Sequence, residues 1–126
     1  MKQKNVYMLG KEDDKAVQLF ARLGMPKNMA KTLLYLSQVP ECKSADIEQF
    51  ANMRQPEVSV AMQELRKRGW AKKRDLKKKG KGRPVHIYEP AMDLSKVWKA
   101  FEQEKLKEVE AVKNDISELK NIIKSR

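Results

Sequence analysis

The 126 residues carry a formal net charge of +11 at pH 7, and 40% of them are hydrophobic, 36% charged and only 6% aromatic. A chain of this length forms one domain with a modest core, which leaves little room for a deep catalytic pocket. Its single cysteine, Cys42, excludes a disulfide within the chain and a thiolate metal cluster. We see no secretory or membrane-spanning segment, and therefore expect a cytoplasmic protein. We also expect no cofactor and no metal ion.

Almost all of the positive charge lies in one stretch of the chain. Between Arg66 and Arg83 there are eleven Lys or Arg residues and one acid, Asp75, so eighteen residues hold +10 and the other 108 hold +1. A surface that serves only solubility spreads its charge and mixes the signs. A concentrated patch is typical of proteins that bind a polyanion.

The residues before this stretch predict three short helices. Asp13 or Asp14 caps a first helix that Gly24 ends. Pro26 suits the first turn of a second helix that Pro40 stops. Ser44 is a good N-cap for a third helix over 45–51, with Asp46 in its first turn. The expected apolar face of the second helix consists of Met29, Leu33, Leu34 and Leu36, with Tyr35 on its flank.

A fourth helix follows after only three residues, 52–54, and Pro56 opens it. Two short helices joined by a tight turn are typical of a helix-turn-helix. At 3.6 residues per turn, the core face of this helix, 55–68, is expected to be Val58, Ala61, Met62 and Leu65. The opposite face carries Pro56, Val60, Gln63 and Lys67, flanked by Ser59 and Arg66.

Val60 on that outer face has two interpretations. An exposed β-branched residue can contact a thymine methyl group in a DNA groove. Scattered exposed apolar side chains are also common on protein surfaces and carry no functional meaning. The sequence leaves both open.

Two strands, 70–74 and 85–89, are predicted to form a hairpin that Pro90 ends, with Val85, Ile87 and Glu89 alternating with His86 and Tyr88. His86 is the only histidine and is interpreted as a packing or surface residue. With one histidine and no phosphate-binding glycine pattern, we find no catalytic site and expect a protein that is not an enzyme.

The last predicted helix starts near Asp93 or Ser95 and runs to about Ile123, which makes it about 45 Å long. Five apolar residues near its end are spaced 3, 4, 3 and 4 apart, as in a coiled coil. We therefore expect residues 1–92 to form one domain and 93–126 a helix that joins two copies of the chain. The predicted dimerisation residues are Val109, Val112, Ile116, Leu119 and Ile123.

Residues 24–89 resemble the winged helix-turn-helix domain of prokaryotic, especially archaeal, transcription regulators of the broad MarR/TrmB/ArsR-like group. The residues that carry this resemblance are 23–26 and 33–36, the segment 45–51, the pattern Val58, Ala61, Met62, Leu65, Gly69 and Trp70, and Gly82, Arg83, Pro84 and Tyr88. The resemblance implies a mainly α fold with a small β-hairpin wing. It also implies a dimeric regulator with the helix from Gln55 in the major groove and the wing on the backbone or minor groove. The sequence lacks the C-terminal sugar-binding domain of TrmB proper.

Two groups of residues are predicted to contact double-stranded DNA. Base readers are polar or small side chains on the outer face of the helix, and cations around them contact phosphate without reading sequence. Arg83, between Gly82 and Pro84, suits a narrow minor groove. The base-reading candidates are Gln55, Pro56, Ser59, Val60 and Gln63. The phosphate candidates are Arg54, Arg66, Lys67, Lys72, Lys73, Arg74, Lys77, Lys78, Lys79, Lys81 and Arg83.

Two other functions agree with the same features. Winged helices also serve as protein-interaction modules in the transcription machinery, where the long helix would dock on a different protein. Alternatively, the wing would act as a nonspecific clamp on DNA or RNA, as in a chromatin protein. The sequence does not identify an effector.

Overall fold

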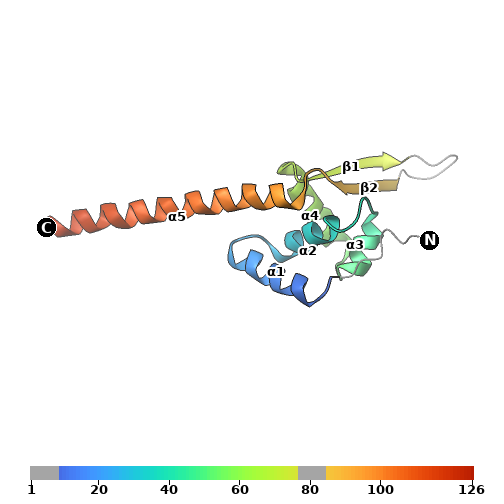
Figure 1. Cartoon of the computed structure of the whole chain (residues 1–126), viewed down its shortest axis with the longest axis horizontal. Helices are drawn as coiled ribbons and strands as arrows, with labels where there is room; N and C mark the ends of the chain where they lie inside the picture. The colour runs from blue at the N-terminus through green and yellow to red at the C-terminus, as the bar shows by residue number, and fades with distance from the viewer. Residues whose placement is uncertain (1–8, 77–84) are drawn as a thin grey trace. The chain divides into compact units, whose positions relative to one another are not determined.

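The structure is a computed structural model that describes residues 9–76 and 85–126 (Figure 1). The predicted fold class, mainly α with a small β-hairpin, is confirmed. In chain order the elements are α1 (Lys11–Arg22), α2 (Lys27–Leu36), α3 (Ser44–Phe50), α4 (Gln55–Lys67), β1 (Ala71–Leu76), β2 (Val85–Pro90) and α5 (Leu94–Lys124). The chain divides into two compact units, residues 1–93 and 94–126. Within the described ranges, no helix is long and apolar enough to cross a membrane.

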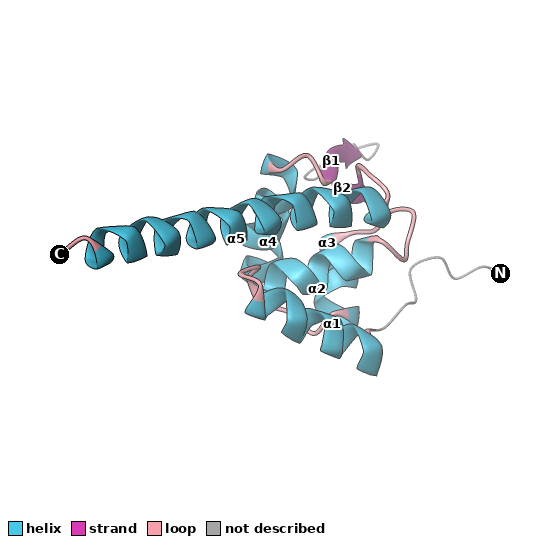
Figure 2. Cartoon of the chain, turned by 60° about the vertical axis from the view of Figure 1, so that its left-hand side comes forward, coloured by secondary structure: helices cyan, strands magenta, loops and turns pink. Residues whose placement is uncertain are grey.

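Helix α2 is at the centre of the first unit, where it contacts α1, α3, α4 and β2 (Figure 2). Seven of its ten residues are buried. The prediction for Tyr35 was wrong, because this side chain is fully buried and its ring stacks on Phe50 at 6.2 Å between centroids. Because four elements pack around α2, its buried surface is wider than the single apolar stripe that the helical period predicts, and it includes Tyr35.

Three helices in the first unit begin with the same hydrogen bond. The backbone N–H groups of Gly10, Lys43 and Arg54 each donate, over 2.9 Å, to a carboxylate three residues later. The acceptors are Asp13, Asp46 and Glu57, which also lie favourably at the positive end of each helix dipole. The predicted caps, Asp13 or Asp14 for the first helix and Ser44 for the third, are therefore corrected, since Gly10 and Lys43 hold these positions. Asp13 lies inside its helix, and the Ser44 hydroxyl donates to Glu48 at 2.9 Å.

The predicted tight turn between α3 and α4 is confirmed, and a side-chain hydrogen bond connects it to α2. Asn52 adopts a φ of +55°, a conformation that asparagine tolerates better than most residues. Met53 then points inward, is 6% exposed, and its sulfur accepts a hydrogen bond from Thr32 of α2 at 3.5 Å. The helix-turn-helix thus rests on the central helix through a buried contact, which fixes the direction of α4.

Strands β1 and β2 pair in antiparallel register from Ala71 opposite Pro90 to Leu76 opposite Val85. Cys42 adds a third, one-residue pairing, because its backbone exchanges hydrogen bonds of 2.9 and 2.7 Å with that of Tyr88. The predicted strand alternation fails at this point, since Ile87 and Tyr88 are both buried. The first strand also runs two residues further than predicted and includes Asp75.

Gly69 makes the sharp connection from α4 to the hairpin. Its φ of +79° is easily reached only by glycine. The turn brings the Trp70 N–H to the Leu65 carbonyl at 2.9 Å, and the Arg68 guanidinium lies over the Trp70 ring at 4.9 Å from its centroid. Because Trp70 is buried, this junction anchors the start of the hairpin to the C-terminal end of α4.

The second unit is the helix α5, which begins at Leu94, between the two predicted starts Asp93 and Ser95, and continues for 31 residues. Val97 and Phe101 are buried, whereas every large apolar residue from Leu106 onward is exposed, as Ile116 is by 61% and Ile123 by 63%. Exposing a whole stripe of apolar side chains on one helix is unfavourable in water.

Three buried groups predict that the protein loses stability in alkaline solution. Burial, chiefly, raises the pKa of the Cys42 thiol from 9.0 to about 12, and it also raises the pKa of the Tyr35 and Tyr88 phenols above 10.0. Above about pH 9 the unfolded chain therefore loses protons that the folded chain keeps. The free energy of unfolding should fall by up to about 1.4 kcal/mol per pH unit for each such group. Urea unfolding at about pH 8 and pH 11 measures this, and equal stability at both would contradict it.

Candidate nucleic-acid interface

The outer face of α4 carries all five predicted base readers. At about 100° per residue, the residues Gln55, Pro56, Ser59, Val60, Gln63, Arg66 and Lys67 fall within about 140°. The predicted core residues Val58, Ala61, Met62 and Leu65 are buried on the other side. Val60 is 60% exposed, and Ser59 is half-buried. The structure therefore presents one continuous face with amide, hydroxyl and methyl groups at its middle and cations towards its C-terminal end.

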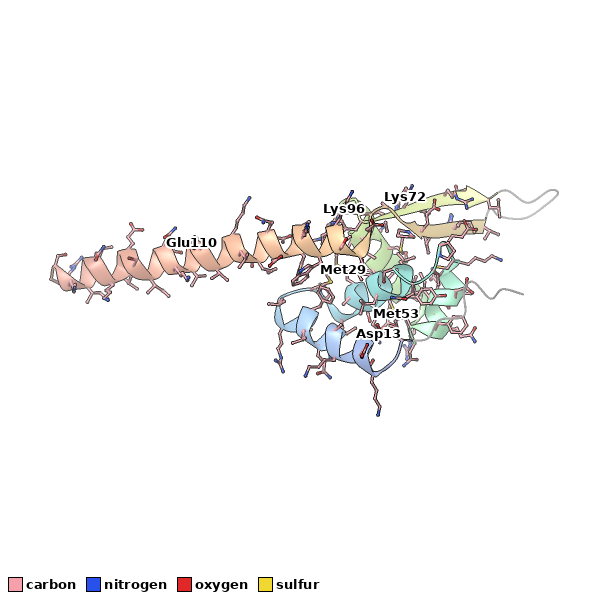
Figure 3. All side chains as sticks on the ribbon, viewed as in Figure 1. Asp13, Met29, Met53, Lys72, Lys96 and Glu110 are labelled. Carbon is pink, nitrogen blue, oxygen red and sulfur yellow. The ribbon has the colours of Figure 1, made fainter. Side chains whose placement is uncertain are left out.

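A groove of about 580 Å³ runs beside Val60, between α4 and the start of α2. One wall is formed by Pro56, Val60 and Glu64 of α4, and the other by residues 26–29. Met29, labelled in Figure 3, also lines the groove and is buried. Val60 is thus the exposed edge of an apolar groove, and not an isolated surface residue.

The groove also brings residues to the site that sequence reasoning missed. Lys27 and Asn28, which start α2, line the groove opposite Val60. Glu57 and Glu64 lie on the same side of α4, and both acids would repel phosphate. The Glu57 carboxylate accepts the hydrogen bond that caps α4, and the Glu64 carboxylate forms an ion pair with Lys67 at 3.7 Å. No local pattern could have found Lys27 or Asn28, because only the packing of α2 on α4 places them there.

Gln63, Arg66 and Lys67 line a shallow depression at the C-terminal end of the outer face. Arg66 also links this end to the hairpin. Its positive charge offsets part of the rise that burial causes in the pKa of Tyr88 on β2. The C-terminal end of α4 therefore lies close enough to β2 for a charge on one to affect a group on the other.

The cations of β1 differ in their availability. Lys72, labelled in Figure 3, and Lys73 are exposed and form no ion pair within the described part of the chain. Arg74, by contrast, pairs with Glu41, and its Nε lies 3.5 Å from the Glu89 carboxylate. The guanidinium is therefore already satisfied by two acids, which the sequence could not reveal because Glu41 is 33 residues away.

Five of the predicted phosphate contacts, Lys77, Lys78, Lys79, Lys81 and Arg83, lie outside the described residues. Arg54 precedes α4 and is exposed, so it extends the cationic border to the N-terminal end of the outer face. The predicted dimerisation residues lie on α5 and are all exposed.

No side-chain cluster among the described residues suits a metal ion. His86 is on the surface, where its Nδ1 lies 2.7 Å from the Asp75 carboxylate directly across the hairpin. Cys42 is buried and its pKa is raised to about 12, so its thiolate form is scarce at neutral pH. The described functional groups of the first unit thus form a cationic surface that can donate and accept hydrogen bonds.

No protein-family model matches the sequence, and no relative is found among curated proteins. Solved structures are similar in fold. The archaeal chromatin protein TrmBL2, whose structure shows a novel mode of DNA binding, matches 90% of this chain with a TM-score of 0.62 and 17% identity. This chain spans only 41% of that protein's length.

A possible transcriptional regulator from Methanosarcina mazei matches 83% of this chain and 87% of its own, with a TM-score of 0.64 and 11% identity. NadR, in complex with 4-hydroxyphenylacetate, matches 89% of this chain and 81% of its own, with a TM-score of 0.51 and 14% identity. Together with the helix-turn-helix and the hairpin described above, these similarities show that the chain has the winged helix-turn-helix fold.

Proposed function

We propose that this protein is a DNA-binding transcription regulator that acts as a homodimer. The observation that carries the proposal is the position of the charge. The stretch that holds +10 of the +11 net charge begins on the outer face of α4 and continues along the chain through β1 to residue 83. A winged helix that borders a hydrogen-bonding helix face with cations is suited to place that helix in the major groove.

The described contacts support separate roles for the two parts of the site. Gln55, Ser59 and Gln63 would donate to and accept from base edges, and a glutamine amide can engage adenine with two hydrogen bonds. The Val60 methyl groups, at the edge of the groove, would contact a thymine methyl. Lys72, Lys73 and the cations of 77–83 would neutralise phosphates on the backbone, which adds affinity without sequence choice.

A salt titration tests DNA binding itself. If each dimer neutralises six to ten phosphates, its affinity for duplex DNA should fall about 10³- to 10⁵-fold between about 50 and 200 mM salt. Fluorescence anisotropy with a labelled duplex measures the slope. An affinity that does not change with salt, or no binding at the lower salt concentration, would contradict the proposal.

A second candidate function is a nonspecific DNA clamp. It is favoured by the distribution of the charge, because only three polar side chains on α4 face outward as base readers whereas the cations are many. Competition between a site selected from random DNA and an unrelated duplex separates the two functions. A regulator should prefer its site by about 10³-fold or more, and equal affinities would support the clamp.

The ion pairs of Arg74 predict a difference between neighbouring cations of β1. Lys73→Ala should lower the salt slope of DNA binding by about 0.9 for each protomer, the value for one lost phosphate contact. Arg74→Ala should leave the slope nearly unchanged, because Glu41 and Glu89 already neutralise the guanidinium. Both variants remove one positive charge, so each controls for the other. Equal slopes in the two variants would show that Arg74 is as available as Lys73.

A further inference from the structure

We infer that α5 pairs with α5 of a second copy as a parallel, in-register two-stranded coiled coil. This inference rests on the proposed homodimer and adds its orientation. It starts from the exposed stripe Val109, Val112, Ile116, Leu119 and Ile123. In a heptad, Val109, Ile116 and Ile123 occupy the a positions and Val112 and Leu119 the d positions.

The residue types at these positions favour two strands. All three a positions are β-branched, and Leu119 is at d. β-branched residues at a combined with leucine at d favour parallel dimers over larger bundles. Leu106 and Ile122 flank the stripe and are also exposed, so pairing would cover further apolar surface at both ends.

The charges beside the stripe decide the direction of the second helix. The g positions are acidic at Glu108 and Asp115, and the e positions five residues later are basic at Lys113 and Lys120. In a parallel pair each g residue faces the e residue five positions on in the partner, so Glu108 meets Lys113 and Asp115 meets Lys120. In an antiparallel pair e faces e and g faces g, which would set lysines against lysines and acids against acids.

The charges on α5 also indicate where the paired segment begins. Continuing the heptad towards the N-terminus places Lys105 at d and Glu102 at a, where two copies would meet with like charges. Lys105 is held on its own helix, where its Nζ donates to Glu108 at 3.1 Å and lies 5.4 Å from the centre of the Phe101 ring. The paired segment therefore begins after Lys105, and Glu108 would serve both lysines.

The orientation has a consequence for DNA binding. Each winged unit is joined to α5 at Leu94, so a parallel pair has both winged units attached at the same end of the coiled coil. An antiparallel pair centred on Ile116 would set the two Leu94 ends about 66 Å apart, at about 1.5 Å per residue. That separation is nearly twice the roughly 34 Å between adjacent half-sites on one face of DNA.

Disulfide cross-linking of the full-length protein tests the orientation. Val112→Cys and Leu119→Cys are made as separate single variants. The unchanged protein, whose Cys42 is buried, is the control for cross-linking through the native cysteine. In a parallel, in-register pair both variants should form covalent dimers on mild oxidation, because each cysteine lies opposite its own copy within disulfide reach. Asn114→Cys, on the outer face of the helix, is the matched control and should remain uncross-linked.

The outcomes separate this inference from the proposed function. No antiparallel register brings both positions opposite themselves, so a dimer in which at most one variant cross-links would overturn the parallel orientation alone. If sedimentation shows that the unchanged protein is a monomer, the homodimer itself fails.

A charge-reversed variant provides an independent measurement without new cysteines. Glu108→Lys combined with Asp115→Lys should raise the dissociation constant of a parallel dimer at least about tenfold, because four attractive pairs become repulsive. In an antiparallel dimer the facing charges would be alike before and after the change. An unchanged dissociation constant would therefore contradict the parallel pairing.

Discussion

Ile116→Lys is expected to turn the dimer into monomers and to weaken binding to a two-half-site DNA by about 10²- to 10⁴-fold. Ile116 is the central a position of the exposed stripe and is 61% exposed in the single chain, so the substitution should cost the folded monomer little. In the dimer it would bury two lysines against each other, which is strongly unfavourable. DNA binding suffers because the second half-site is then no longer engaged within the same molecule.

Asn114→Lys is the matched control for this prediction. It adds the same charge two residues away, on nearly the opposite side of α5, and should leave both dimer and DNA affinity unchanged. Analytical ultracentrifugation measures the assembly, and anisotropy with one-half-site and two-half-site duplexes measures binding. Affinity for one half-site should stay the same. If Ile116→Lys remains dimeric, the stripe is not the interface.

Replacing Lys77, Lys78, Lys79 and Lys81 with alanine is expected to weaken DNA binding by roughly 10³-fold or more at about 0.1 M salt. Each phosphate contact contributes about 0.9 to the slope of affinity against salt, so four lost contacts would lower the slope by about 3.6 for each protomer. The loss should be similar for selected and random DNA, because phosphate contacts carry no sequence information.

The control removes the same charge from another place. Lys11, Lys15, Lys99 and Lys107 are exposed helical residues outside the predicted interface, and alanine preserves their helices. This fourfold variant should retain most of the affinity and a nearly unchanged slope. Equal losses in the two variants would mean that net charge alone drives binding, without a defined contact surface.

Much of the fold follows from local features of the sequence. Gly24, Gly69 and Pro56 mark helix ends and starts, and the apolar spacing of α4 separates its buried face from its outer face correctly. These features are local, because they depend on backbone conformation and on the helical period. They were sufficient to predict the helix-turn-helix, the hairpin and the long last helix.

Local features failed where an element is covered on more than one side. Tyr35 was expected at the flank of α2, yet four elements surround that helix and bury it. Tyr88 was expected to alternate with its neighbour Ile87, but both are buried, and β2 contacts both α2 and α3. Periodicity indicates which side of an element is apolar, and it cannot count the elements that will pack on it.

The sequence by itself determined that the protein concentrates its positive charge beside a short helix and carries an apolar heptad at its end, since both depend only on residue order. Among the described residues, only the tertiary structure decided which of those cations are free of acidic partners and which residues lie beside the helix. It pairs Arg74 with an acid far away in the chain and sets Lys27 and Asn28 across a groove from Val60. The physical reason is that electrostatic and packing contacts depend on distance in space, and the chain brings remote residues together only on folding.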